Sequence, residues 1–352
     1  MTAEDYKVWE KRWHPLLQEW VIIASHRHSR PWNGSVLEGQ DIELPKFDSN
    51  CYLCPGNMRA NNTINPKYEN IFVFSNDFPS ISLNAPTALH KPYGIYKNAP
   101  AKGIAKVLCY TPFHNITMAE LDLLQIENII DTWRKETSLL SKIYGIKNVI
   151  IFENKGLDCG ASNPHAHCQI FATDFLYKNI NTQLEASYNY FVENNNYLFH
   201  DIINAELEEG NRIIFENRKA IAFLPYFSRY PFESYITTKK TYPYVTMITD
   251  YEVQDLAKAI KSTLVKYDNL WKTPLPYVMM IQQAPTDSSN YNFFHFHIEI
   301  YPIFRQKDLK KYLGGAEIGG GNFHSDICPE KSAEILLSLS SDHYKKQCRT
   351  SN

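Results

Sequence analysis

The chain lacks long apolar runs and has almost no net charge. No stretch of about 18 consecutive apolar residues occurs, and residues 1–13 are charged and aromatic, so we expect neither a membrane span nor a signal peptide. A cytoplasmic location is then the default expectation. The net charge is -2 over 352 residues, which gives no electrostatic reason to expect nucleic acid or a membrane as a partner, although local basic clusters could bind a small anionic substrate.

Cysteine is also scarce and does not predict a disulfide framework. There are seven cysteines, an odd number, and the only close pair is Cys51 and Cys54. The spacing suits one zinc ion, whereas a thioredoxin-like redox pair would need the start of a helix in a βαβ context. The Pro-Gly dipeptide that follows favours a knuckle-like turn and therefore zinc. A closed tetrahedral site needs two more ligands, for which His114 and His165 are candidates.

Strands and helices are predicted to be interspersed without strict βαβ alternation. A capping box predicts a helix from Thr117 to about residue 143, and further helices are predicted after Asp250 through Leu264 and from Pro329 through Leu337. Short β-branched or aromatic runs predict strands at 20–24, 71–74, 106–110, 147–152, 169–173, 212–215, 221–224, 277–281 and 296–300. This order favours an α+β fold over a doubly wound sheet.

The predicted elements also indicate an internal duplication. The order strand, helix, strand, histidine-containing strand, helix occurs loosely twice along the chain. The polar segment 193–197 separates the two occurrences, and its length indicates a local loop instead of a flexible linker. We therefore predict an N-terminal repeat at 1–195 and a C-terminal repeat at 196–352, packed together as one body.

The segment 163–169 is the most informative part of the chain. If it continues as a strand, His165, His167 and Gln169 point to one face, because side chains alternate with a period of two. A preceding loop with small side chains and free backbone donors could cradle a phosphate; it contains Gly156, Gly160, Ser162 and Asn163. An imidazole beside an anion cradle suggests phosphoryl chemistry. A pair of histidines on a strand can equally be structural or bind only a metal, and the motif alone leaves these alternatives open.

Six ordered segments resemble the galactose-1-phosphate uridylyltransferase family of the histidine-triad superfamily. They are HRHSRPWNG at 26–34, CYLCPGN at 51–57, FSNDF at 74–78, FENKGLDCGASNPHAHCQ at 152–169, PYFSRYPFE at 225–233 and YDNLW at 267–271. The resemblance implies two diverged histidine-triad-like repeats with a mostly antiparallel sheet and helices packed on it. It also implies a ping-pong transfer of UMP between UDP-glucose and galactose 1-phosphate through a uridylyl-His167 intermediate, with Gln169 donating to the phosphoryl oxygens.

The resemblance further implies the remaining site residues, position by position. The zinc ligands would be Cys51, Cys54, His114 and His165. The nucleoside would meet Asn76 and Asp77, and the phosphates Arg27 and Arg30, which without the motif would be read as a solvated surface pair. The loop over the phosphates and hexose would contribute Asn154, Gly160 and Ser162, and a C-terminal segment that contacts the hexose would contribute Lys311, Tyr312 and Glu317. The resemblance also implies a homodimer whose chains share the pocket, with a UDP-sugar and a hexose 1-phosphate as partners.

The chain departs from the family at a second metal site that some relatives build from one glutamate and three histidines. The corresponding positions here are Gln183, Gln282, His297 and Glu299. Glutamine is a poor ligand for a transition metal, so we expect the second site to be absent or much weakened. His295, His297 and Glu299 still alternate on one predicted strand face, which leaves a vestigial metal site or a structural hydrogen-bond network open.

A second departure is the glycine-rich segment 314–321, where several relatives have bulkier residues. It is more similar to the branch that includes ADP-glucose phosphorylase. An ADP-glucose or dinucleoside-polyphosphate phosphorylase that uses the same histidine is therefore the alternative function. A non-catalytic, zinc-stabilised binding protein is the alternative of another class, and the presence of His167, Gln169 and Ser162 argues against it.

Overall fold

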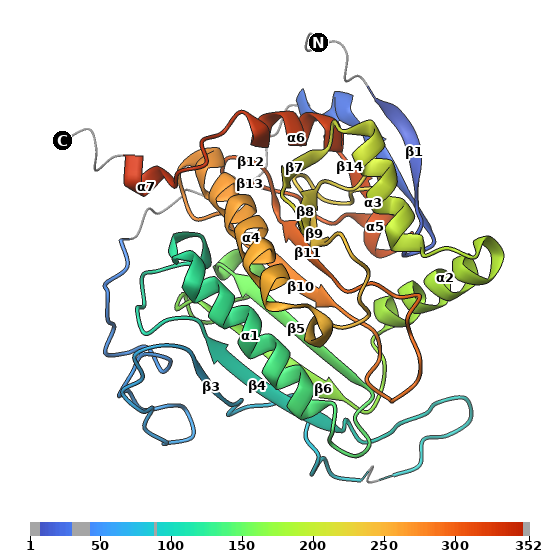
Figure 1. Cartoon of the computed structure of the whole chain (residues 1–352). Coiled ribbons are helices and arrows are strands. Elements are labelled where there is room, and N and C mark those ends of the chain that lie inside the picture. Colours follow the sequence, from blue (N-terminus) through green and yellow to red (C-terminus); the bar gives the residue numbers. More distant parts are fainter. Residues whose placement is uncertain (1–7, 30–42, 88–89, 348–352) are drawn as a thin grey trace.

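A nine-stranded antiparallel sheet organises the computed structural model, which describes residues 8–29, 43–87 and 90–347 (Figure 1). In spatial order its strands are β3 (Phe72–Ser75), β4 (Gly103–Cys109), β6 (His167–Thr173), β5 (Asn148–Lys155), β10 (Tyr277–Gln282), β11 (His297–Pro302), β9 (Ser234–Thr238), β8 (Ala220–Phe223) and β7 (Ile213–Glu216). All neighbouring pairs are antiparallel. The predicted α+β class with a mostly antiparallel sheet is confirmed.

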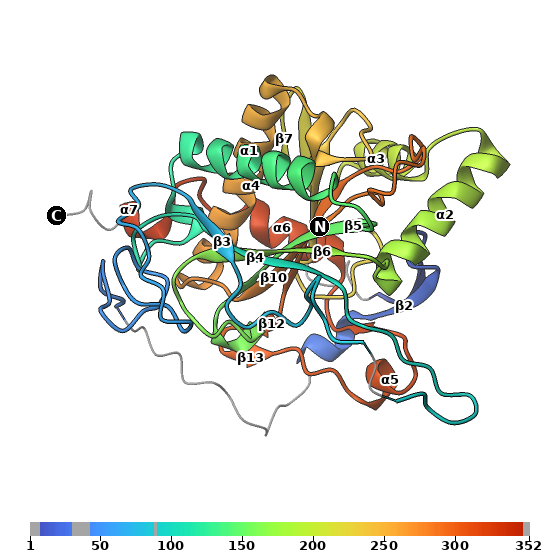
Figure 2. The same ribbon diagram turned by 90° about the horizontal axis from the view of Figure 1, so that it is seen from below.

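Two long helices cover one face of this sheet: α1 (Leu123–Leu140) and α4 (Asp250–Trp271) (Figure 2). Their apolar stripes are fully buried in the main core, as Ile130 and Trp133 of α1 and Ile260 of α4 show. The opposite side carries loops, the short strands β12 (Phe304–Gln306) and β13 (Leu309–Lys310), and the short helix α5 (Gly315–Ile318) (Figure 2). Side chains that project from the sheet toward this second side are therefore available to form a site.

Eight of the nine strands, all except the edge strand β7, form two repeats of the same order of elements. The first repeat is β3-β4-α1-β5-β6 and the second is β8-β9-α4-β10-β11. They join through the antiparallel pair β5–β10, in which Phe152 lies opposite Met280. The repeats therefore share one continuous sheet and one core.

Further helices and a small separate sheet surround the main sheet. Helices α2 (Lys178–Asn194) and α3 (Leu198–Glu209) connect the repeats, and α6 (Pro329–Leu337) follows near the C-terminus. A separate three-stranded sheet contains β1 (Trp9–His14), β2 (Glu19–Ala24) and β14 (His324–Ser325). No helix in the described parts of the chain is both long enough and apolar enough to cross a membrane.

The structure corrects two details of the predicted elements. The capping box at Thr117 begins a short 3-10 helix and not α1. Asp122 caps the start of α1 separately by accepting a hydrogen bond from the Gln125 backbone at 2.8 Å. The predicted local loop at 193–197 is narrowed to residues 195–197, because α2 ends at Asn194, Asn195 adopts a left-handed conformation (φ 51°), and α3 begins at Leu198. The predicted starts of α4 and α6 are confirmed.

Candidate active site and metal centre

The face of β6 that points away from the helices carries the histidine and glutamine predicted to react with phosphate. Cys168 and Ile170 are completely buried in the core, whereas His167 and Gln169 point to the other face and are half-buried. The predicted alternation is thus confirmed for these two residues. It is wrong for His165, because β6 begins only at His167 and the fully buried His165 ring turns into a neighbouring cluster.

That cluster contains all four predicted metal ligands. The ligand atoms of Cys51, Cys54, His114 and His165 all lie within 4.8 Å of one another, and the four side chains are buried. The Cys54 Sγ atom is 3.7 Å from His114 Nδ1 and 3.6 Å from His165 Nδ1. A tetrahedral zinc ion with ordinary bond lengths would hold sulfur and nitrogen ligands about 3.6 Å apart. The spacing therefore fits one tetrahedral metal.

Neighbouring polar groups orient these ligands toward a metal. The Nε2 atom of His165 lies 2.8 Å from the Thr111 carbonyl oxygen, which can only accept, so Nε2 carries the proton and Nδ1 presents its lone pair to the cluster. The Asn163 amide donates to Cys51 Sγ at 3.2 Å. Burial is the main reason that the pKa of Cys54 is raised to about 12, and the neighbouring Cys51 adds to this increase, so a bound cation would favour the thiolate form of Cys54 at neutral pH.

The hydrogen bond of His167 fixes which of its nitrogen atoms can react. Its Nδ1 atom lies 2.7 Å from the His165 carbonyl oxygen and must donate to it. The Nε2 atom therefore keeps its lone pair. Burial lowers the pKa of His167 below its ordinary value, although the same backbone hydrogen bond opposes this shift, and the ring is neutral near pH 7. His165 thus links the metal cluster to a neutral imidazole two residues later.

Of the predicted phosphate-loop residues, Asn154 shares the face of this imidazole, and Gly160 and Ser162 lie in the loop after β5. Asn154 has the same parity on β5 as Phe152, which pairs with Gln169, so it shares the face of His167. Gly160 has φ 78°, a left-handed conformation that favours glycine, and the Ser162 hydroxyl lies 2.9 Å from the Tyr52 hydroxyl. The loop after β5 therefore has small residues and a left-handed glycine, as an anion-binding loop requires.

The predicted nucleoside residues follow β3 on the same side of the sheet. The Asn76 backbone continues the β3–β4 pairing through a bond to the Ala105 carbonyl at 2.9 Å, and its side chain accepts the Phe78 N–H at 2.9 Å. This turn fixes Asp77, whose side chain is 8% exposed and lies 3.7 Å from the Arg59 guanidinium. Arg59 was not predicted as a site residue.

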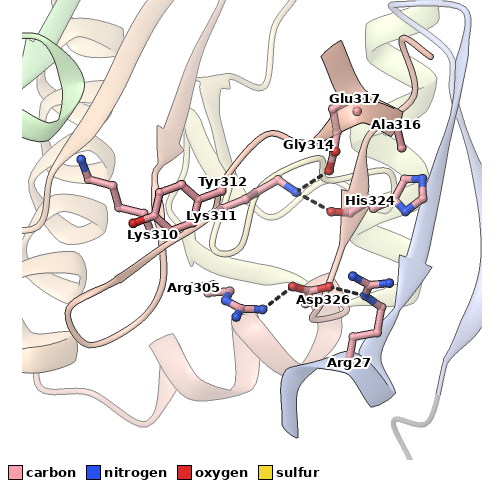
Figure 3. Close-up of a pocket in the computed structure, with 11 residues that line it drawn as sticks. Arg27, Arg305, Lys310, Lys311, Tyr312, Gly314, Ala316, Glu317, His324 and Asp326 are labelled. Carbon is pink, nitrogen blue, oxygen red and sulfur yellow. Dashed lines mark hydrogen bonds and ion pairs between the residues drawn. The ribbon is translucent and has the colours of Figure 1, made fainter. Parts of the chain in front are cut away.

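The other predicted substrate residues surround a separate cavity of about 420 Å³ (Figure 3). It is lined by Arg27, Lys311, Tyr312 and Glu317, among others, whereas His167 and Gln169 do not line it. Asp326 joins Arg27 at 3.1 Å and Arg305 at 2.6 Å, and Lys311 lies 3.5 Å from Glu317. The predicted phosphate residue Arg30 lies outside the described residues. The predicted site is therefore divided between two places on one chain.

The second repeat places a comparable histidine motif in a closed hydrogen-bond network. His297 Nδ1 lies 2.9 Å from the His295 carbonyl, as in the first repeat, but its Nε2 lies 3.1 Å from Glu299. Gln183 and Gln282 donate to the two oxygens of that carboxylate at 3.0 and 2.7 Å. Burial alone would raise the pKa of Glu299, but the hydrogen bond and charge of His297, followed by the hydrogen bonds from Tyr301 and Gln282, lower it to about 2. This histidine has no lone pair directed at open space.

Comparisons with known proteins identify two family models that match successive parts of the chain. Family models described as "Galactose-1-phosphate uridyl transferase, N-terminal domain" and "C-terminal domain" match residues 1–177 and 183–348. The galactose-1-phosphate uridylyltransferase of Haemophilus influenzae is 33% identical over 340 residues, which cover 96% of this chain and 97% of the relative. That of Schizosaccharomyces pombe is 34% identical over 368 residues, which cover 98% and 99%.

Solved structures with the same fold include two enzymes. A structure described as uridylyltransferase is 28% identical, with a TM-score of 0.75 and coverage of 94% of this chain and 97% of that one. An ADP-glucose phosphorylase from Arabidopsis thaliana with bound ADP-glucose has a TM-score of 0.76 at 23% identity, covering 94% and 98%. At that identity the second likeness establishes only the fold.

Proposed function

Because this chain belongs to the galactose-1-phosphate uridylyltransferase family, we propose that it transfers UMP between UDP-glucose and galactose 1-phosphate through His167. It is a transferase, as its relatives are. The observation that carries the assignment of the nucleophile is the hydrogen bond from His167 Nδ1 to the His165 carbonyl, which leaves Nε2 as the reactive nitrogen on a half-buried face.

The reaction proceeds in two displacements at the same phosphorus atom. Nε2 of His167 attacks the α-phosphorus of UDP-glucose, the N–P bond forms, and the P–O bond to glucose 1-phosphate breaks, so that glucose 1-phosphate leaves with the electron pair. A phosphate oxygen of galactose 1-phosphate then attacks the same phosphorus and releases the neutral imidazole and UDP-galactose. Gln169, two residues after His167 on the same face of β6, donates an N–H to the phosphoryl oxygens without adding charge.

We propose one zinc ion at Cys51, Cys54, His114 and His165. It supplies no bond-making step and serves to hold the two thiolates and the His165 ring in place. The backbone from His165 to His167 then has a fixed start, and the imidazole keeps its angle to the bound phosphate. The thiolates require a reducing compartment, which supports a cytoplasmic location.

We also propose that the boundary between the two repeats lies between residues 195 and 196. We further propose a homodimer in which each chain completes the other's site. The separation on one chain of His167 from the cavity of Arg27, Lys311, Tyr312 and Glu317 supports the shared arrangement. Basic groups in that cavity suit the phosphate of a hexose 1-phosphate, and Glu317 suits its hydroxyl groups.

The adduct on His167 identifies both the nucleophile and the nucleotide. After brief incubation with UDP-glucose and rapid denaturation at neutral to alkaline pH, the intact protein should gain the mass of one uridylyl group, and His167→Ala should gain none. An adenylyl adduct formed faster from ADP-glucose would replace the uridylyl assignment by the phosphorylase, which the glycine-rich segment 314–321 favours. No adduct with either donor would favour the non-catalytic binding protein.

We propose that the second repeat binds no metal. Both oxygens of Glu299 already accept hydrogen bonds, and Gln183 and Gln282 present N–H groups where a metal would need lone pairs. Metal analysis of the purified protein should therefore find one metal ion per chain, and Cys51→Ser/Cys54→Ser should reduce this to nearly none. A ratio near two, or a metal that survives in the double variant, would contradict the proposal.

A further inference from the structure

Arg59 is a buried charge whose hydrogen-bonding capacity is largely unused. Its side chain is 11% exposed, and its guanidinium carbon lies 4.4 Å from the centre of the Phe74 ring. Among the described residues, Nε and Nη1 have no hydrogen-bond partner although both are buried. Burying such donors without partners is costly, so an unused pair points to a missing acceptor.

Asp77 is the only carboxylate that forms an ion pair with Arg59 in the described part of the chain. Its Oδ1 atom lies 3.7 Å from Arg59 Nη2, which is too long for a hydrogen bond, and this oxygen is also buried without a hydrogen-bond partner. The two side chains therefore attract each other and still leave donors and an acceptor for a third group. A small ligand that both donates and accepts would satisfy them.

The knuckle-like turn that carries Cys51 and Cys54 holds Arg59 in this place. The Arg59 backbone bonds to the Thr63 carbonyl at 2.8 Å and so closes a turn directly after the knuckle. Below this turn, Asn65 N–H donates to the Asn57 carbonyl at 2.9 Å, and the Asn65 amide donates to the Cys54 carbonyl at 3.1 Å. On the other side, the turn at Asn76 fixes the backbone of Asp77. The gap between the two charges is thus set by rigid elements.

We propose that Arg59 is a specificity-determining residue that reads the ribose of the nucleotide donor together with Asp77. A ribose hydroxyl group can donate to the Asp77 carboxylate while its oxygen accepts from Arg59, which matches the unused groups on both side chains. Stacking on Phe74 holds the guanidinium plane in position. This inference rests on the proposed function, because it takes Asp77 to be at the nucleoside.

The test compares single-turnover labelling of His167 by UDP-glucose and by its 2′-deoxy and 3′-deoxy analogues. Arg59→Met keeps the length of the side chain and its contact with Phe74 but removes the charge and the donors. We expect the half-saturating concentration of UDP-glucose to rise about 10- to 100-fold, the loss of a charge-assisted hydrogen bond. With the deoxy analogue that lacks the recognised hydroxyl group, the same substitution should change labelling less than threefold.

Three controls separate this role from a structural one. Arg218 is an exposed arginine between β7 and β8, and Arg218→Met should leave the labelling by UDP-glucose and by both deoxy analogues unchanged. Arg59→Lys keeps the charge without the planar guanidinium. It should weaken UDP-glucose binding by an intermediate amount and leave binding of the deoxy analogue that lacks the recognised hydroxyl group unchanged. If Arg59→Met does not fold, Arg59→Lys provides the test instead. Asp77→Asn should weaken UDP-glucose binding, and adding Arg59→Met to it should cost little more, because both substitutions remove the same recognition.

Equal losses with UDP-glucose and both deoxy analogues would overturn the proposal and make Arg59 a structural residue. Labelling of Arg59→Met and Arg59→Lys at the wild-type level would also overturn it. If the wild-type protein forms no uridylyl adduct, the proposed function itself fails, and that outcome is separate from any effect of Arg59.

Discussion

His167→Ala is expected to lower the rate of uridylyl transfer at least about 10,000-fold, because it removes the atom that forms the covalent bond. His297→Ala, at the corresponding position of the second repeat, should instead leave most of the activity and destabilise the protein. The two histidines share the hydrogen bond from Nδ1 to the carbonyl two residues earlier, at 2.7 and 2.9 Å. They differ in what Nε2 meets.

In the first repeat Nε2 is directed at the half-buried face, where a donor phosphate can bind, and in the second repeat it contacts Glu299 at 3.1 Å. His297 is completely buried and stacks on Phe199 at 4.3 Å between ring centres. Removing it leaves a cavity and takes one partner from a buried carboxylate, which should cost about 3 kcal/mol of unfolding free energy. Replacing the half-buried His167 by alanine should lower the unfolding free energy by less than about 1 kcal/mol.

The measurements are the rate of exchange of labelled glucose 1-phosphate with UDP-glucose and the free energy of unfolding by urea, on both variants. His167→Gln serves as a matched control that keeps a polar side chain of similar size but cannot form the intermediate. Substantial exchange in His167→Ala would contradict the assignment of the nucleophile. A stable but inactive His297→Ala would show that the second repeat takes part in catalysis.

Local sequence patterns predicted the parts of the site that depend on neighbouring residues. A strand period of two places His167 and Gln169 on one face, and the two-residue spacing of Cys51 and Cys54 brings two thiols to one turn. The proline that begins α6 marked the start of that helix for a similar local reason.

The remaining features depend on contacts between distant residues and had no local signal. A helix was predicted after the histidine-containing strand, where α2 lies, but its bounds and helix α3 were not predicted, because their N-caps, Tyr177 and Tyr197, form no side-chain capping bond. Arg59 meets Asp77 only after the knuckle has folded against β3. Gln183 and Gln282 reach Glu299 from a helix and a neighbouring strand, which no spacing along the chain reveals.

Mixing two inactive variants should restore activity if the site is shared between chains. The first variant is His167→Ala, and the second is Lys311→Met/Glu317→Gln, which removes both partners of an ion pair and leaves no buried charge unpaired. In a mixed dimer, one site would combine both mutated parts and the other would combine both intact parts. Random exchange of subunits should therefore raise the activity from near background to about a quarter of the wild-type value.

The geometry makes this outcome informative, because the cavity is separate from the reactive face on one chain and yet contacts the loop after β5. Lys310, at the edge of the cavity, forms an ion pair with Asp158 in the loop that carries Gly160. If the cavity completed the site of its own chain, mixing could restore nothing, since each chain would lack one half. Native mass spectrometry of the mixture must show mixed dimers, and a second mixture of His167→Ala with His167→Gln must stay inactive. Mixed dimers without activity, or a protein that stays monomeric, would contradict the shared site and place hexose 1-phosphate recognition within one chain.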